Sequence, residues 1–228
     1  MLFENQHELS LAPKCFFMAA IVLASIFGVY LMFQDADGMI RWLKPYALNG
    51  DLARQVILMF CLLFYVSRLF VTVFVFLKRK MSWPETLLIS ALMSFVLFSF
   101  ARVGGGSEQP IGAVEIFGLL LYLFGSYLNT FSEYQRYVWK AKPENKGRLY
   151  TEGLFKYSMH VNYFGDVVLF IGFALITNHF TMLIVPLAMT ANFVLFVIPA
   201  LDKYLANKYG REFQEYAEQT KKLIPMAY

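Results

Sequence analysis

GLFKYSMHVNYFGDVVLFIGFALIT, residues 153–177, changes abruptly from polar to apolar sequence. Its first half places Lys156, His160, Asn162 and Asp166 among aromatic side chains, and its second half has no charged residue. A boundary of this kind is typical of a chain that leaves water and enters an apolar environment. The rest of the sequence indicates what that environment is.

The composition is that of a multi-pass membrane protein. Hydrophobic residues make up 58% of the 228 residues and charged residues only 16%, whereas a soluble domain has about 25% charged residues. A soluble domain of this size has too little interior to bury so much apolar surface. Because no linker or low-complexity tract divides the chain, we expect a single membrane domain over residues 1–228.

Apolar runs of suitable length predict an all-α membrane bundle. A helix needs about 20 apolar residues to cross a bilayer. The last run, Val167–Ile198, is too long for one crossing and is interrupted at Asn178–His179, so we divide it into two helices. The other expected spans are Cys15–Phe33, Val56–Leu77, Leu87–Ala101 and Ile111–Phe131. The prediction is six transmembrane helices, or seven if one run re-enters the membrane.

The Lys and Arg residues predict the orientation of these helices. Cytoplasmic loops carry the excess of basic residues, and six spans place most of the 20 Lys and Arg residues on the side of both termini. Both termini are therefore expected in the cytoplasm, in a bacterial inner membrane or in the endoplasmic reticulum. The net charge of +4 then reflects topology and requires no nucleic-acid partner.

Cysteine and histidine give no metal signature. Cys15 and Cys61 lie in or beside apolar runs, and we expect both to be buried core residues. The three histidines, His7, His160 and His179, are too scattered to form a metal set. We expect no bound metal.

Small polar residues next to the spans predict a pocket. Asn129 and Glu133 are four residues apart near the end of the fourth span, and Asn162 and Asp166 are four apart near the start of the fifth. Residues at this spacing share a helix face, and polar groups at membrane depth are usually functional. Together with the basic loop at 132–164, the two faces predict a pocket for a polar anion such as a nucleotide cofactor. A solvated rim of helix ends remains the alternative.

Four segments resemble the membrane steroid 5-alpha-reductase family and, more distantly, the sterol reductases and the isoprenylcysteine or phospholipid methyltransferases. The resemblance extends from about residue 55 to the end, so we divide the chain into an N-terminal helix and outer loop, 1–54, and a reductase-like cofactor-binding region, 55–228. The matching segments are GLFKYSMHVNYFGD at 153–166, CLLFYVSRLFVTVFVF at 61–76, NTFSEYQRYVWK at 129–140 and YGREFQEYAEQTKKLIP at 209–225.

The resemblance implies an NADPH-dependent oxidoreductase that reduces the carbon–carbon double bond of a lipophilic, steroid-like enone inside the membrane. It places Tyr65 at the catalytic tyrosine of the family, and Asp35 is our candidate for the family's acidic partner of that tyrosine. The implied cofactor-binding residues are Arg68, Asn129, Glu133, Lys140, Arg148, His160, Asn162, Asp166 and Tyr209. Among these, Lys140 and Arg148 match basic positions suited to the phosphates. The implied partners are a lipophilic small molecule and membrane lipid.

Three departures from the related families bear on the function. Met159 and Val161 flank His160 where methyltransferases have Arg-His-Pro, which weakens the methyltransferase interpretation. Leu201 and Leu205 occupy the positions of an Arg and a His that contact cofactor in the reductases, which weakens the reductase interpretation. In addition, our candidate for the acidic partner of the tyrosine, Asp35, is an Asp where the family has a Glu. Besides the reductase, an S-adenosylmethionine-dependent membrane methyltransferase and a degenerate lipid-binding membrane protein remain possible functions.

Overall fold

A computed structural model of the protein describes residues 10–34, 48–225 and 227. These residues form helices and connecting turns, and within the described ranges there is no strand. The helices are α1 (Leu11–Phe33), α2 (Leu52–Val71), α3 (Trp83–Gly105), α4 (Ala113–Ala141), α5 (Val161–Ile176), α6 (Ile184–Asn192), α7 (Ile198–Tyr209) and α8 (Arg211–Gln219). Two π-helical segments, Thr72–Phe76 and Phe193–Val197, continue α2 and join α6 to α7.

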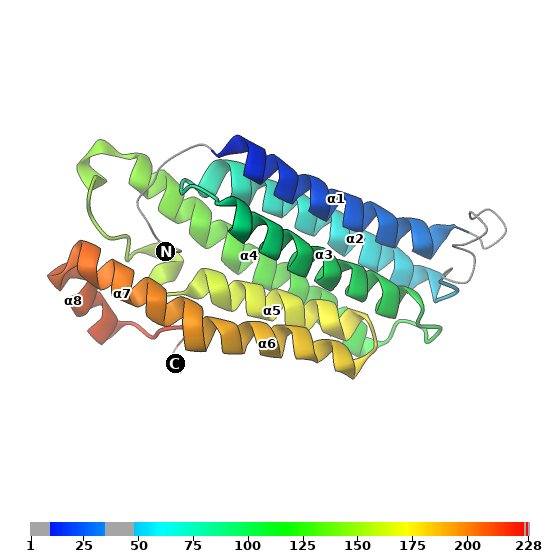
Figure 1. Cartoon of the computed structure of the whole chain (residues 1–228). Coiled ribbons are helices and arrows are strands. Elements are labelled where there is room, and N and C mark those ends of the chain that lie inside the picture. The colour runs from blue at the N-terminus through cyan, green and yellow to red at the C-terminus, as the bar shows by residue number, and fades with distance from the viewer. Residues whose placement is uncertain (1–9, 35–47, 226, 228) are drawn as a thin grey trace.

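The helices form an elongated bundle (Figure 1), in which α1, α3 and α5 run in one direction and α2, α4 and α6 run back. The start of α1, the turn at residues 77–82, the loop at 142–160 and helices α7 and α8 therefore lie at one end, which we call the basic end. The segments predicted to carry the cytoplasmic basic residues lie here. The turns at 106–112 and 177–183 lie at the opposite end.

The described residues confirm the prediction of an all-helical fold, but they do not confirm six or seven spans. Five described helices are long and apolar enough to cross a membrane: Leu11–Phe33, Leu52–Phe76, Trp83–Gly105, Ala113–Ala141 and Phe180–Tyr209. The expected fifth span, α5, has 16 residues and rises about 24 Å. The hydrocarbon core is about 30 Å thick, so α5 alone is short for a crossing.

The long final run is divided into two helices, as predicted. Asn178 adopts a left-handed conformation, with φ of 59°, between α5 and the turn at Phe180–Leu183. Another prediction is wrong: Cys15 is exposed on the surface of α1, whereas Cys61 is buried. Apolar sequence does not distinguish a helix face that meets lipid from one that meets other helices.

Glycines set the distance between α4 and α5, which share the most extensive contact of any two described elements. A Cβ added at Gly125 would collide with the backbone nitrogen of Leu169, and one added at Gly165 would lie 2.6 Å from the backbone nitrogen of Asn129. Only glycine allows the two backbones to come so close. Short polar side chains can therefore reach across from α4 to α5.

The opposite end of the bundle is held by a fully buried arginine, Arg54, in the first turn of α2. Its Nη2 lies 3.3 Å from Glu115 Oε1 of α4 and 2.9 Å from the carbonyl oxygen of Gln109, and its Nη1 donates to the carbonyl oxygen of Ile176 at the end of α5. An arginine can satisfy several acceptors at once because its guanidinium has five N–H donors. Arg54 thus joins the ends of three helices.

Candidate functional site

Four of the predicted side chains meet between α4 and α5 near the basic end. Asn129 Nδ2 donates to Asp166 Oδ2 at 2.9 Å and to the backbone carbonyl oxygen of Asn162 at 3.0 Å. Asn162 Nδ2 in turn donates to Glu133 Oε1 at 2.9 Å. We call these four residues, Asn129, Glu133, Asn162 and Asp166, the polar network. Each helix face contributes one amide and one carboxylate, so donors and acceptors alternate across the contact.

Arg68 brings α2 into contact with this network. Its Nη2 lies 3.1 Å from Asp166 Oδ1, and its side chain is only 6% exposed. The guanidinium carbon of Arg68 lies 5.1 Å from the centre of the Tyr65 ring, one turn earlier on the same helix. Arg68 Nε is buried and has no hydrogen-bond partner among the described residues. A charged group at this depth therefore keeps one donor unused.

Tyr65 is buried beside the network. It is 4% exposed, and its ring packs edge-on against Phe170 of α5, with 5.7 Å between the ring centres. The charges of Arg68 and Asp166 both act on its hydroxyl. The structure thus brings the predicted catalytic tyrosine close to two of the predicted cofactor-binding residues. Asp35, its predicted acidic partner, lies outside the described residues.

Lys140, Arg148 and Tyr209 form a second group at the basic end. Lys140 Nζ donates to the backbone carbonyl oxygen of Arg148 and lies 3.2 Å from the Tyr209 hydroxyl. The same ammonium group lies 5.1 Å from the centre of the Tyr209 ring and 5.3 Å from that of Trp139. The three predicted residues are therefore neighbours, joined through Lys140.

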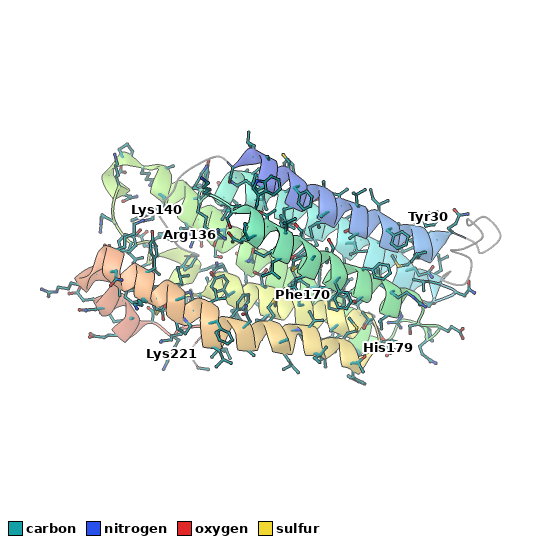
Figure 2. All side chains as sticks on the ribbon, viewed as in Figure 1. Tyr30, Arg136, Lys140, Phe170, His179 and Lys221 are labelled. Atoms are coloured by element: carbon teal, nitrogen blue, oxygen red, sulfur yellow. The ribbon has the colours of Figure 1, made fainter. Side chains whose placement is uncertain are left out.

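Arg136 was not among the predicted site residues, yet it lies between these two groups in sequence. Its guanidinium pairs with Glu133 of the polar network and lies 5.5 Å from the centre of the Phe155 ring. Figure 2 shows Arg136 and Lys140 at the same end of α4, with Phe170 in the middle of the bundle and His179 at the opposite end. The spacing of three residues after Glu133 is the signal that could have identified Arg136.

His160 is not hydrogen-bonded to the polar network. Its Nε2 lies 2.8 Å from Asp202 Oδ1 of α7, and its ring stacks on Tyr163 at 5.6 Å. His160 is the residue directly before α5 and its backbone is not helical, so the i,i+4 spacing that joins Asn162 to Asp166 does not place it. Its role as a cofactor-binding residue stays a prediction.

The loop that follows α4 is held against the bundle by α8. Both carboxylate oxygens of Glu212 accept from the backbone nitrogen of Leu149 at 3.1 Å, and the Tyr216 hydroxyl donates to the carbonyl oxygen of Phe155 at 2.6 Å. Burial raises the pKa of the Tyr216 phenol above its usual range, so this hydroxyl stays protonated. These contacts tie the loop to α8 at the basic end.

No metal site accompanies these groups in the part of the chain that the structure describes. Among the described residues, no group of three or more His, Cys, Asp or Glu side chains is placed to hold a metal ion. The available chemistry is that of amides, carboxylates, phenols and guanidinium groups.

A family model described as "Protein of unknown function (DUF1295)" matches residues 86–220, which is more than half of the chain. The chain belongs to the DUF1295 family. The matched region of this DUF1295 protein contains the polar network, the Lys140 group and the His160–Asp202 pair.

Two rat proteins are similar over a longer stretch. The chain is 26% identical to 3-oxo-5-alpha-steroid 4-dehydrogenase 2 of Rattus norvegicus over 206 residues, covering 86% of this chain and 76% of the rat protein. It is also 26% identical to 3-oxo-5-alpha-steroid 4-dehydrogenase 1 of Rattus norvegicus over 198 residues, covering 81% and 72%. This weak similarity suggests the steroid 5-alpha-reductase family or a related one, and an integral membrane oxidoreductase.

Proposed function

We propose that this protein is a membrane reductase that uses NADPH to reduce the carbon–carbon double bond of a lipophilic enone. The names of the two rat proteins describe dehydrogenation of a 3-oxo-5-alpha-steroid at carbon 4. The reverse of that reaction is the reduction of a double bond conjugated to a ketone. A steroid-like enone is the substrate class that this similarity favours.

The observation that carries the proposal is the position of Arg68. It is buried between Tyr65 and Asp166, and its Nε has no hydrogen-bond partner among the described residues. Most buried polar groups are hydrogen-bonded, so an unused arginine donor beside a network of amides fits an acceptor supplied by a ligand. The phosphates, ribose oxygens and carboxamide of a dinucleotide are acceptors of this kind.

The chain offers a basic residue for each charged part of such a cofactor. Arg136 lies one turn from the network, and Lys140 and Arg148 lie further along towards the end of the bundle. An extended dinucleotide could therefore place its uncharged ring by Tyr65 and its phosphates by Lys140 and Arg148. When bound, NADPH would supply the hydride.

The residues of the chain would supply the proton and the orientation. Negative charge grows on the ketone oxygen as hydride reaches the conjugated carbon, so a donor close to that oxygen lowers the barrier. The Tyr65 hydroxyl would donate this hydrogen bond and proton. Arg68 would hold the phenol in a positive field, while Asp166 and Asn129 keep the guanidinium in place.

The experiment is to purify the protein in lipid nanodiscs and to measure NADPH binding by fluorescence and NADPH oxidation after adding a 3-oxo-4-ene steroid. We expect binding without the steroid and oxidation only with it. Arg68→Gln should weaken NADPH binding. Arg102→Gln, in the last turn of α3 at the opposite end of the bundle, should leave NADPH binding unchanged. A wild-type protein that binds S-adenosylmethionine and no NADPH would overturn the proposal in favour of methyl transfer. A protein that binds neither nucleotide would favour the degenerate lipid-binding protein.

A further inference from the structure

His160 is held in one orientation by groups from three segments. It lies directly before α5 and is 2% exposed. Asp202 of α7 contacts its Nε2 at 2.8 Å, and Tyr163 covers one face of the ring. The ring of Phe193 stacks on Tyr163 at 4.7 Å, so the imidazole is the last member of a short aromatic stack.

The C-terminal segment completes this arrangement. The backbone nitrogen of His160 donates to the carbonyl oxygen of Lys222 at 2.9 Å, and Lys222 Nζ lies 3.5 Å from Asp202 Oδ2. Ser158 Oγ also donates to the carbonyl oxygens of Lys222 and Leu223, at 3.1 and 2.8 Å. Asp202 is therefore contacted by His160 and by Lys222 together.

This geometry assigns the tautomer of the neutral ring. A carboxylate accepts hydrogen bonds, so Nε2 beside Asp202 carries the hydrogen and Nδ1 is left with a lone pair. Nδ1 makes no hydrogen bond to any described residue.

We infer that Asp202 is a positioning residue, which fixes His160 with its hydrogen on Nε2 so that Nδ1 accepts a hydrogen bond from the bound nucleotide. This inference rests on the proposed function. A dinucleotide carries suitable donors in its carboxamide, its exocyclic amine and its ribose hydroxyls. His160 would contact the nucleotide from the side of α5 that faces α7. The polar network would contact it from the side that faces α4. The two sets of residues would therefore hold different parts of one extended ligand.

The tautomer can be measured directly, because the chain has three histidines. Nitrogen-15 NMR of protein labelled at histidine separates a protonated ring nitrogen from one with a lone pair. Variants at His7 and His179 assign the remaining signal to His160. At alkaline pH, we expect His160 Nδ1 to be unprotonated, and we expect NADPH to shift the Nδ1 signal. A protonated Nδ1, or an Nδ1 signal that NADPH leaves unchanged, would overturn the inference.

Asp202→Asn tests the positioning role, because an asparagine amide can donate to Nε2 and so move the ring hydrogen to Nδ1. We expect that tautomer change, together with NADPH binding weakened by about 2- to 12-fold, which corresponds to one net hydrogen bond. Glu218→Gln is the control, because it removes the same charge from an exposed part of α8. Unchanged binding in Asp202→Asn would contradict the inference while leaving the proposed function intact. A wild-type protein that binds no NADPH would refute both.

Discussion

An arginine placed inside an apolar helix carries a penalty of a few kcal/mol on membrane-insertion scales. Asp166 offsets part of that penalty for Arg68 through a contact of 3.1 Å, and Asn129 holds the other oxygen of the same carboxylate. The stabilisation that the polar network provides therefore depends on Arg68. At the scale of the residue, the proposed reaction depends on the hydrogen bond that Arg68 can donate and on the proton that Tyr65 can donate.

Tyr65→Phe should leave NADPH binding intact and abolish most turnover. Phenylalanine keeps the ring and its edge contact with Phe170 and removes only the hydroxyl. General-acid catalysis contributes about 10²–10⁴-fold, so the turnover number should fall by that amount. The assay compares enone reduction and NADPH binding in the same preparation. Tyr127→Phe, at an exposed position of α4, is the control, and full activity in Tyr65→Phe would mean that the proton comes from another group.

Replacing Lys140 and Arg148 together by Ala should weaken NADPH far more than NADH. Both residues lie at the end of the site where the extra phosphate of NADPH would bind, and a charge-assisted hydrogen bond contributes about 1.5–3 kcal/mol. The measurement is the dissociation constant of each nucleotide, which for NADPH should rise by at least about tenfold. A Lys142→Ala, Lys146→Ala variant, from the same loop, serves as the control. An equal loss for the two nucleotides would exclude this role.

The sequence predicts the polar network well because its evidence is local. Two pairs at i,i+4 spacing place Asn129 with Glu133 and Asn162 with Asp166, and the structure brings both pairs together. The pairing of His160 with Asp202 depends on how α7 packs against α5, and no local spacing encodes it. Whether any of these residues binds a cofactor is untested and stays a prediction.

At the scale of the element, hydropathy locates the helices but not their ends. The fourth span was expected to end at Phe131, yet α4 continues to Ala141, because its polar last turns bond to the loop at 142–160 instead of meeting lipid. The polar faces of α4 and α5 were expected to meet, but the close glycine contact between the two helices was not predicted. Its signal is in the sequence, since Gly118 and Gly125 on α4, and Gly165 and Gly172 on α5, are each seven residues apart, which is nearly two helical turns.

Gly125→Ala should separate α4 from α5 and destabilise the protein by about 1–3 kcal/mol, the usual effect of overpacking. The new Cβ would meet backbone atoms of Leu169 and Gly165, which cannot move aside as a flexible side chain would. Thermal unfolding in detergent measures the effect. Gly106→Ala is the control, because the nearest atom to its added Cβ is 3.4 Å away. An unchanged melting temperature in Gly125→Ala would mean that the close helix contact is not needed.

At the scale of the whole molecule, the sidedness of the bundle follows from helices that alternate in direction (Figure 1). This alternation was predictable from the number of apolar runs, including the short α5. The positive-inside rule predicts that the basic end faces the cytoplasm. The direction of the bundle in the membrane remains a prediction.

Cysteine labelling tests this orientation. In a background with Cys15→Ser and Cys61→Ala, a cysteine at the exposed position of Glu108 should react with a membrane-impermeant maleimide added to intact cells. A cysteine at the exposed position of Lys146 should react only after the membrane is opened, because residues 108 and 146 lie at opposite ends of α4. The reverse pattern would invert the topology. Equal labelling of both positions in intact cells would contradict a spanning α4.

The partnership between Arg68 and Asp166 also constrains how the protein is made. The two residues are 98 positions apart in the chain. At a synthesis rate of about 5–20 residues per second, Arg68 is added to the chain about 5–20 s before Asp166. During that interval Arg68 depends on water or lipid headgroups near the end of α2, and the helix settles fully only when α5 arrives. Membrane insertion of this protein should therefore pass through an intermediate in which α2 is not yet stably packed. That intermediate ends when Asp166 of α5 pairs with the charge of Arg68.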